Sequence, residues 1–571
     1  WCLKKDKSQI IKNRSHVFFP SIFDKKKLLL FKEEIVRLRK LIQPKIIENL
    51  NKIHNVNYDL NFWNLILDPW LGDYLEYNFT RWLTIEEVID NNQNTSFDFF
   101  SYKFDKSQFV CFDVQSSFVT PNLSSDIYNQ YFYQEIINFF KNEKNINFID
   151  TGETLTYQSK KREKSNIFHF NAKKFSSYLK KLFIGKNRIY INAWDISRIE
   201  LLKINLAIGQ FPFNPGFLFS EKNYMNILSE DILKYDVNLR NKITFNFQKK
   251  INFESYIMNR IKFDLPNYTL ENFKKIYSFI ESLNLHQKYI ISGGDHFYNV
   301  LFKFWMAFNK NNKNKILTLD HGIHNGVERG HVFYQEEIGD INLNFYKKMK
   351  PKEVQLPSLR LSKYINIRER NRLADKLLYV SYDNMIYPNN ILISPICSKS
   401  KYVIEYFQKL TQYLREDINK DVLIRPTFKK HFPVPWVKDE LIEKFSKNYK
   451  IVEKNYINFY RESKIVVCTY PQTSFAEALI SGPAILLTKL DFWPYFNKFE
   501  ELKNDMIASK IIFQDPIEAA KHINNVWDNP SDWWNSKNVK IVRQKFINET
   551  ALASNKALNL FINYLNEIKK K

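Results

Sequence analysis

Two stretches near the start of the chain, residues 21–56 and 61–91, carry apolar positions at helical spacing. Both are predicted to be helices, and Pro44 is expected to interrupt or kink the first. The apolar positions of the second are mostly aromatic, which is more typical of a packed core than of a ligand site. Residues 92–190 alternate short aromatic strands and helices with polar connections. The spacing in the first stretch is set by Ile35, Leu38, Leu41 and Ile42.

A sharper pattern begins near residue 285. Lys288–Ser292 is predicted to be a buried strand, and Gly293-Gly294 follow it. Asp295–Phe308 has helical spacing, with Asp295 as the expected N-cap. The next predicted strand, Ile316–Leu319, leads into Asp320-His321-Gly322. This order of strand, helix and strand predicts a parallel α/β unit.

A second alternation of strands and helices extends over about 170 residues from Lys376, which matches one Rossmann-like domain. The polar, strand-poor stretch 347–374 is the expected connection before it, and a helix over Leu552–Ile568 is expected after it. The predicted domains are therefore 1–360, 361–545 and a C-terminal helix with a basic tail, 546–571. The predicted strands are Lys376–Tyr382, Asp421–Ile424, Lys464–Thr469 and Ala484–Leu487, and the predicted helices are Lys401–Leu414, Val437–Ser446, Phe475–Ser481 and one opened by Asp515 and Pro516.

Composition narrows the class of protein. The 571 residues are 44% hydrophobic and 16% aromatic, with 12 Gly and 19 Pro, which excludes disordered and collagen-like chains. The four cysteines form no CxxC pair, so neither a disulfide scaffold nor a zinc ribbon is expected, and a reducing compartment fits best. No apolar run approaches the roughly 20 residues that span a bilayer, and no signal peptide is visible.

The net charge of +24 has two interpretations. It would attract an anionic partner such as a nucleotide or a membrane surface. Alternatively, it reflects AT-rich coding, since Lys, Asn, Ile, Phe and Tyr are all abundant. The lysines are interleaved with acidic residues and form no Arg-rich block, so no nucleic-acid partner is predicted.

The first candidate site is the stretch Asp320–Gly326, at the carboxyl end of a predicted strand, where ligands of open α/β sheets bind. Asp320 and His321 are candidate proton-transfer groups, although a tight turn with polar caps would also explain the pattern. A metal cluster of Asp320 with three histidines is disfavoured, because the spacing matches no helical HExxH motif and the glycines favour a loop. Those histidines are His321, His324 and His331.

Three further motifs follow predicted strands. Gly293-Gly294 precede a helix whose backbone N–H groups suit an anion or a sugar, with Asp295 as a second catalytic candidate; a turn with a cap is the simpler alternative. Arg425 ends a strand and could bind phosphate. Thr469–Glu477 place hydroxyls at a helix N-terminus, where Ser474 and Glu477 have capping-box spacing. No GxGxxG, GxxxxGK[ST] or GxSxG motif occurs.

Several short motifs, weak singly but specific in their order and spacing, resemble a bacterial family of transferases linked to surface-carbohydrate gene clusters. The resemblance covers nearly the whole chain. Members usually carry a segment before Trp1-Cys2, so a first strand is expected to be missing. The motifs are Trp1-Cys2, Asn61-Phe62-Trp63, Asp68-Pro69-Trp70-Leu71-Gly72, Gly293-Gly294, Phe302-Lys303-Phe304-Trp305, His321-Gly322, Thr469-Tyr470, Thr473, Ser474, Trp527-Asp528 and Trp533-Trp534-Asn535-Ser536.

This family is similar to GT-B glycosyltransferases, which have two Rossmann-like domains facing a cleft. More narrowly, it resembles enzymes that use CMP-activated acidic sugars of the Kdo or nonulosonic-acid type. The resemblance implies an α/β, GT-B-like fold with extra N-terminal helices, a nucleotide-sugar donor held by 361–545, and an acceptor bound by 1–360. His321 and its neighbours would face the acceptor or the anomeric carbon. By the same resemblance, Arg425 would contact the donor phosphate, with Thr473 and Ser474 assisting. The other predicted donor-binding residues are Thr469, Glu477, Gly293, Gly294 and Gly322.

The sequence departs from the family pattern at two motifs. Asp320 stands where the family usually has Gln, and Ile323, His324 and Asn325 replace a glycine- and tyrosine-rich continuation. Thr427-Phe428-Lys429 replace a histidine-containing turn after Arg425. A different donor or acceptor is therefore compatible with the sequence.

Three functional hypotheses remain open. The first is a glycosyltransferase that moves an acidic keto-deoxy sugar from a CMP-activated donor to a surface-glycan or protein acceptor. It would need no metal or other cofactor, and it would be cytoplasmic, at the inner face of the membrane. The second is a CDP-glycerol-type polyol-phosphate transferase, although Thr469–Ser474 lacks the acidic residue that such enzymes usually carry. The third is a non-catalytic glycan-assembly protein with the same fold.

Overall fold

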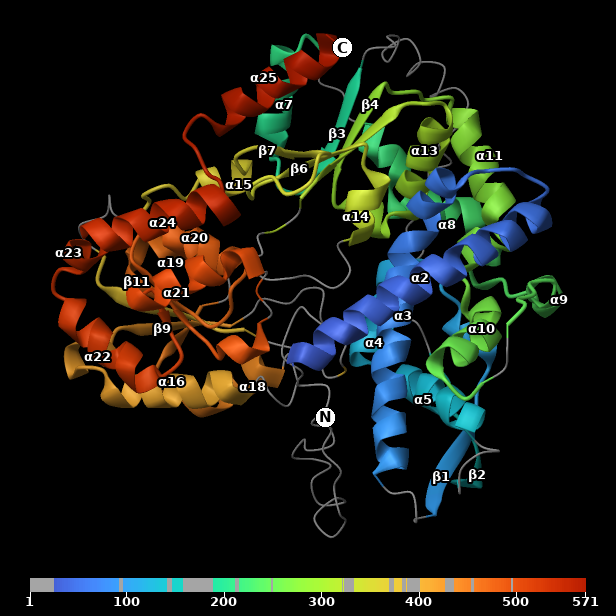
Figure 1. Cartoon of the computed structure of the whole chain (residues 1–571), viewed down its shortest axis with the longest axis horizontal. Helices are drawn as coiled ribbons and strands as arrows, with labels where there is room; N and C mark the ends of the chain where they lie inside the picture. The colour runs from blue at the N-terminus through green and yellow to red at the C-terminus, as the bar shows by residue number, and fades with distance from the viewer. Residues whose placement is uncertain are drawn as a thin grey trace.

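The computed structural model of the chain is shown in Figure 1. The residues that it describes are 25–91, 96–140, 146–157, 188–210, 215–247, 250–320, 322, 333–368, 374–382, 387, 401–426, 436–452, 456–493, 495 and 497–570.

A five-stranded parallel sheet forms the upper part of the molecule in Figure 1. The strand order equals the chain order, so each strand pairs with the next one in sequence. Its central strands are buried because helices cover both faces, as in other parallel sheets. The strands are β3 (Ile189–Ala193), β4 (Tyr289–Gly293), β5 (Lys315–Leu319), β6 (Ile341–Asn344) and β7 (Glu353–Gln355).

A six-stranded parallel sheet forms the C-terminal half, in the order β10-β9-β8-β11-β12-β13. Its strands are β8 (Lys376–Val380), β9 (Val422–Arg425), β10 (Lys450–Ile451), β11 (Ser463–Cys468), β12 (Ala484–Leu487) and β13 (Ile512–Phe513). The helices of this half are α16 (Tyr402–Tyr413), α17 (Glu416–Asn419), α18 (Trp436–Phe445), α19 (Tyr456–Glu462), α20 (Thr473–Ser481), α21 (Glu500–Ala508), α22 (Pro516–Val526), α23 (Pro530–Trp534) and α24 (Lys537–Thr550).

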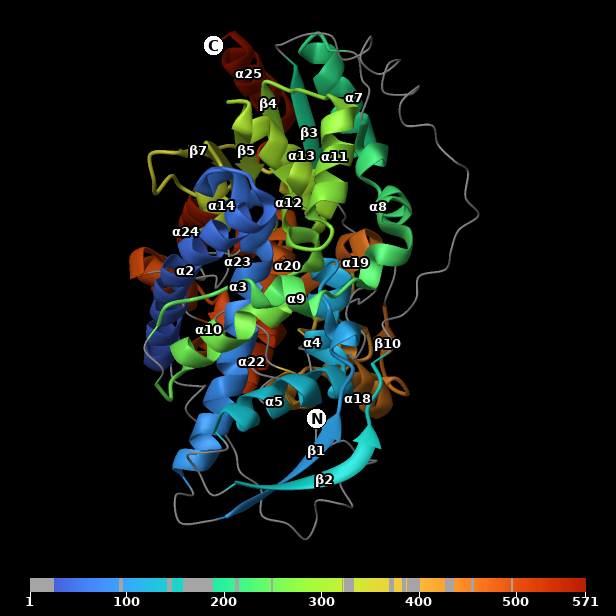
Figure 2. The same cartoon turned by 90° about the vertical axis from the view of Figure 1, so that its right-hand side faces the viewer.

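Long helices surround the first sheet and extend away from it. In α2 the helix continues through Pro44, and α3 continues through Pro69. Figure 2 shows a separate parallel pair, β1 and β2, at the opposite end of the molecule from β3 and β4. These elements are α2 (Lys25–His54), α3 (Leu60–Asp90), β1 (Phe97–Lys103), α4 (Thr120–Ser124), α5 (Asp126–Phe140), β2 (Ile146–Thr154), α7 (Arg198–Ala207), α8 (Glu221–Leu228), α9 (Val237–Asn241), α10 (Phe253–Asp264), α11 (Phe273–Leu283), α12 (Asp295–Tyr298), α13 (Val300–Asn311), α14 (Phe333–Ile338) and α15 (Leu359–Ser362).

The predicted fold class is confirmed by these two parallel sheets and the extra N-terminal helices. The aromatic stripe of α3 is core, as its pattern indicated: Trp63, Trp70 and Trp82 are buried in one apolar cluster with α2, α11 and α13. The two faces of the first sheet belong to different cores. Ile290 packs with the helical additions, whereas Ile291 packs in the cluster that includes α20 and the C-terminal helix.

Three predicted elements differ from the structure. The helix predicted over Asp295–Phe308 is two helices, α12 and α13, because the Asn299 side chain accepts a hydrogen bond from the Phe302 amide and opens a new helix there. The stretch 347–374 contains β7 and α15, which are too short to produce a periodic signal. The predicted helix Leu552–Ile568 begins only at Ala557, as α25 (Ala557–Lys570).

The C-terminal helix packs beside the first sheet. Helix α25 packs against α7 and α15, and its apolar residues Phe561 and Leu565 share a core with Ile204. Figure 1 shows α25 beside α7 at the top of the molecule.

The predicted domain boundaries at residues 360 and 545 stay predictions. Among the described residues, no helix has the length and apolar character needed to cross a membrane.

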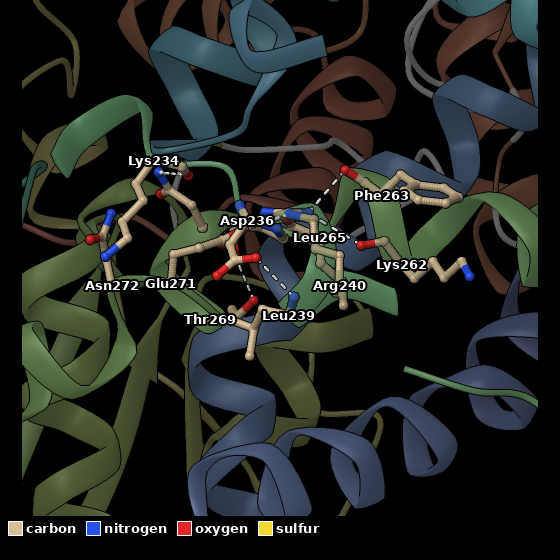
Figure 3. A network of polar contacts seen from close by, with 12 residues as sticks. Lys234, Asp236, Leu239, Arg240, Lys262, Phe263, Leu265, Thr269, Glu271 and Asn272 are labelled. Atoms are coloured by element: carbon tan, nitrogen blue, oxygen red, sulfur yellow. Dashed lines mark hydrogen bonds and ion pairs between the residues drawn. The ribbon is translucent and has the colours of Figure 1, made fainter. Parts of the chain in front are cut away.

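A buried arginine joins the loop elements around α9 and α10. Arg240 is buried, and its guanidinium makes two hydrogen bonds to Glu271, from Nε at 2.7 Å and from Nη2 at 2.9 Å (Figure 3). Its Nη1 donates to the carbonyls of Lys262, Phe263 and Leu265, which lie at the end of α10. Carbonyls at a helix C-terminus have no partner within the helix, so Arg240 completes the hydrogen bonding of this end.

Candidate functional site

The candidate residues of the first sheet lie at the carboxyl ends of its strands. Asn192, Ser292, Thr318 and Asn342 stand opposite one another across β3, β4, β5 and β6. Thr318 Oγ1 and Asn342 Oδ1 are 2.6 Å apart, so these two side chains share one face. Successive side chains of a strand point to opposite faces of the sheet. The residues two positions further along therefore lie on the same face as these four, at the ends of the strands.

Trp194, Gly294, Asp320 and Asn344 occupy those next positions. The backbone pairing between β5 and β6 extends to Asp320, because the Asp320 amide donates to the carbonyl of Leu343 at 2.8 Å. Asp320 is buried, whereas nearly half of the Trp194 surface is exposed. At the carboxyl edge of the first sheet, the Asp320 carboxyl, the Asn344 amide and the Trp194 indole therefore lie on one face.

The carboxyl edges of the two sheets meet at Gly322 and Thr473. Gly322 follows β5 with φ +77°, and a Cβ added there would stand 3.2 Å from Thr473 Oγ1. Thr473 is the first residue of α20, which follows β11. The positive φ and the short approach both favour glycine at position 322. Two motifs that lie about 150 residues apart in the sequence are therefore adjacent.

Arg360 makes a second connection between the sheets. Its Nη2 lies 2.8 Å from Glu477 Oε1 on α20, and its Nη1 lies 3.4 Å from Asp195 Oδ1, just after β3. Glu477 is only 1% exposed, and this burial raises the pKa of its carboxyl, which the charges of Arg360 and Arg425 oppose. Arg360 thus holds α20 against the carboxyl edge of the first sheet.

The predicted capping box at α20 is wrong. The N-cap is Gln472, and no side chain caps the helix. Ser474 Oγ is 2.8 Å from the Tyr470 hydroxyl, and Glu477 pairs with Arg360. The helix also begins at Thr473, two residues before the predicted Phe475. The first turn contains no acidic residue, so no carboxylate there offsets the positive end of the helix dipole.

Arg425 lies beside this helix N-terminus. It ends β9, and its Nη1 is 3.4 Å from the Tyr460 hydroxyl, with the guanidinium 5.9 Å from the ring centroid. The Tyr460 hydroxyl in turn donates to the carbonyl of Ser474 at 3.2 Å. The charge of Arg425 also acts on Tyr470, whose pKa burial raises and Arg425 lowers. A cation and a helix N-terminus therefore converge at the carboxyl edge of the second sheet.

Thr469 has a supporting position. It is buried, its hydroxyl accepts from the Tyr382 amide at 2.7 Å, and its hydroxyl oxygen lies 3.2 Å from the Val380 carbonyl at the end of β8. Its own carbonyl accepts from the Tyr402 hydroxyl at 3.0 Å. These bonds fix the loop that carries Tyr470 and α20 onto the neighbouring strand.

The glycine pair at the end of β4 has a packing role in the structure. A Cβ on Gly293 would stand 3.0 Å from the Cβ of Ala193, so β3 and β4 could not keep this spacing. Gly294 has φ +145°, and a Cβ there would stand 2.4 Å from the Trp194 indole. Glycine is therefore needed at position 294, whereas a Cβ at position 293 would require Ala193 to shift, in both cases independently of any ligand.

Asp295 is not the N-cap of the helix that it opens; Gly294 occupies that position. The Asp295 carboxylate instead accepts from Asn192 Nδ2 and from Trp194 Nε1, each at 2.7 Å. Next in the chain, the buried His296 ring has its Nδ1 2.8 Å from Ser292 Oγ. Asp295 therefore orients Trp194 at the sheet edge.

Sequence reasoning missed Asn344. It ends β6, next to Asp320 on the same face, and it is only 1% exposed. Neither its amide nitrogen nor its amide oxygen makes a hydrogen bond within the described part of the chain. Buried amides normally have partners, so Asn344 is a candidate to contact a ligand or an ordered water. A lone Asn after a short strand gives no signal in the sequence that could have identified it.

Comparison with known families identifies the chain. The model of a family described as LIC12162 family transferase matches residues 1–565. The chain belongs to this transferase family. No curated protein sequence matches it.

Solved structures similar to the transferase include three enzymes with low sequence identity. MurG of Acinetobacter baumannii is 12% identical, with a TM-score of 0.30, over 52% of this chain and 77% of that protein. The wall teichoic acid polymerase TagF is 12% identical, with a TM-score of 0.32, over 70% and 93%. The glycosyltransferase SsfS6 of Streptomyces sp. SF2575 is 7% identical, with a TM-score of 0.30, over 65% and 98%.

The histidines of the first motif lie outside the described residues. In the sequence, His321 stands between Asp320 and Gly322, both of which are described. His324 and His331 belong to the stretch 323–332, which is not described. In the described ranges, no group of three or more His, Cys, Asp or Glu side chains is placed to hold a metal ion.

Proposed function

We propose that this transferase is a glycosyltransferase that moves an acidic keto-deoxy sugar from a CMP-activated donor to a surface-glycan or protein acceptor. The contact between Gly322 and Thr473 carries the proposal. It brings the Asp320-His321-Gly322 motif of the first sheet to the N-terminus of α20 in the second, so a donor held by one sheet could react with an acceptor held by the other. The family resemblance to enzymes of Kdo-like and nonulosonic acids supplies the donor class.

Donor binding is assigned to the second sheet. Arg425 and the first turn of α20, with Thr473 and Ser474, would hold the donor phosphate, because a guanidinium and a helix N-terminus both favour an anion. The same groups would stabilise the CMP leaving group as its negative charge develops. Thr469, Glu477, Gly293, Gly294 and Gly322 would support this arrangement through the packing described above.

Proton transfer is assigned to the first sheet. His321 or Asp320 would accept the proton of the attacking acceptor hydroxyl, because both precede the residue that touches Thr473. Asp295 would act indirectly, by orienting Trp194. The net charge of +24 is consistent with an anionic donor and with work at the inner face of the cytoplasmic membrane.

The proposal is tested by thermal unfolding with CMP, UDP, GDP and CDP-glycerol in parallel. CMP at 100 times its dissociation constant should add about 2.7 kcal/mol of stability. Replacing Arg425 by Ala removes a charged hydrogen-bond donor to phosphate, which should weaken CMP binding by about ten- to hundred-fold. At the same CMP concentration, the stabilisation should then fall from about 2.7 kcal/mol to between about 1.4 and about 0.4 kcal/mol.

Arg415→Ala is the matched control. Arg415 precedes β9 at the opposite edge of the same sheet and pairs with Asp417 and Asp528 on the surface, so its loss should leave the CMP shift unchanged. A shift with UDP or GDP in place of CMP would overturn the donor assignment. A larger shift with CDP-glycerol than with CMP would favour the polyol-phosphate transferase, and no shift with any nucleotide would favour the non-catalytic hypothesis.

Asn344→Leu tests the ligand position beside Asp320. Because the amide makes no hydrogen bond within the described part of the chain, the substitution should leave the free energy of unfolding unchanged or raise it by about 1 kcal/mol. Release of CMP from CMP-N-acetylneuraminate should nevertheless fall several-fold. Asn342→Leu is the control, because the Asn342 amide is bonded to Thr318 and Glu336; it should lower stability by about 1–3 kcal/mol. Unchanged CMP release by Asn344→Leu would contradict the assignment.

A further inference from the structure

One aromatic side chain at the carboxyl edge of the first sheet is exposed and held rigidly. Trp194 follows β3, and 47% of its surface is accessible. An isolated exposed tryptophan would be free to change rotamer, but this one is fixed by a hydrogen bond from Nε1 to the Asp295 carboxylate at 2.7 Å. Holding a large apolar ring in contact with water is unfavourable, so the arrangement calls for an explanation.

The contact with Gly294 shows which part of the indole is covered. A Cβ added to Gly294 would stand 2.4 Å from both Cδ2 and Cε2, the two atoms shared by the fused rings. Atoms in the middle of the ring system can be approached this closely only from above or below its plane. One face of the indole therefore lies on the Gly294 backbone, and the exposed area belongs to the opposite face and the edges.

The neighbours of Trp194 are suited to a sugar. The Tyr298 ring is stacked nearly parallel to the indole, at 9° and 6.1 Å between centroids, which further fixes the orientation of the indole. Two carboxylates lie beside the indole: Asp295 holds its Nε1, and Asp195 is the next residue in the chain. Carboxylates accept hydrogen bonds from hydroxyl groups, and they repel phosphate.

The position also fits an acceptor. Asp195 is bound to Arg360, which contacts Glu477 on α20, so the indole lies one residue from the connection between the two sheets. We propose that Trp194 is the platform on which the apolar face of an acceptor pyranose stacks. The hydrogens on that face carry partial positive charge and are attracted by the negative face of the indole. Asp295 and Gly294 are positioning residues, since they hold the ring without touching the sugar.

This inference deepens the proposed function and rests on it for the identity of the sugar as an acceptor. It is tested by saturation-transfer NMR on the full chain in the presence of CMP. The probes are the methyl α- and β-pyranosides of glucose, galactose and N-acetylglucosamine at millimolar concentration. At least one should receive saturation on the C–H protons of a single ring face. Trp194→Ala should reduce this signal about tenfold, whereas Trp194→Phe should keep part of it.

Two further variants sharpen the result. Gly294→Ala should cause the same loss as Trp194→Ala, because the added Cβ displaces the indole. Tyr413→Ala removes an equally exposed aromatic at the far end of α16 and should change nothing. Binding that persists in Trp194→Ala, or the absence of pyranoside binding in the wild type, overturns the inference. The stabilisation by CMP is measured in a separate experiment. If the protein binds pyranosides through Trp194 but no nucleotide stabilises it, the proposed function is overturned and this inference is not.

Discussion

Replacing His321 by Ala is expected to lower the rate of CMP release from CMP-N-acetylneuraminate by about a hundred- to ten-thousand-fold, the usual contribution of a general acid or base. The residue stands between Asp320, at the end of β5, and Gly322, which touches Thr473 at the start of α20. In the sequence it is thus the titratable group adjacent to the residue at which the two sheets meet. Asp320→Asn, which keeps the shape of the side chain, should separate the role of the acid from that of the histidine.

The rate should change without a change in nucleotide binding. His321→Ala should keep the stabilisation by CMP, because Arg425 and α20 are untouched. His286→Ala is the matched control: this histidine lies just before β4, at the opposite edge of the same sheet, and contacts Asn284. Its loss should leave the rate unchanged. If His321→Ala retains the wild-type rate and the CMP shift, His321 has no part in the mechanism and Asp320 becomes the candidate base.

Replacing Arg240 by Ala is expected to lower the free energy of unfolding by about 3–5 kcal/mol. The substitution leaves the Glu271 carboxylate buried without its cation, and it removes the donor that serves three carbonyls at the end of α10 (Figure 3). The quantity to measure is the urea concentration at the midpoint of the first unfolding transition that appears as urea is added. The effect should be on stability alone, because this network lies in the helical additions around α9 and α10 and includes none of the proposed site residues.

Two comparisons isolate the cause. Arg37→Ala removes a surface arginine that is 52% exposed and paired with Glu34 and Glu254; it should cost no more than about 1 kcal/mol. The double variant Arg240→Met with Glu271→Leu removes both charges and should recover part of the loss, since an unpaired buried charge is the main cost. A loss of less than about 1 kcal/mol for Arg240→Ala would contradict this account.

The sequence by itself determined the alternation of strands and helices and, with it, the fold class. Hydrophobic periodicity is a local property, so β4, β5, β9, β11 and β12 could be predicted within about one or two residues. It also determined which motifs follow strands, and therefore that Asp320, Arg425 and Thr473 lie at carboxyl edges. The resemblance carried by the short motifs gave the transferase family, which the match over residues 1–565 confirms.

Only the tertiary structure decided which of these edges meet and what each side chain contacts. The capping-box spacing of Ser474 and Glu477 was misleading, because the helix begins at Thr473, before Ser474, and the Glu477 carboxylate pairs with the cation of Arg360. From the sequence, Gly294 is predicted to be a turn glycine. In the structure, the Trp194 indole occupies the space that a Cβ at this position would need. Asn344 gave no local signal. Spacing along a chain reports neighbours within one element, whereas these contacts join residues far apart in sequence, and only packing brings them together.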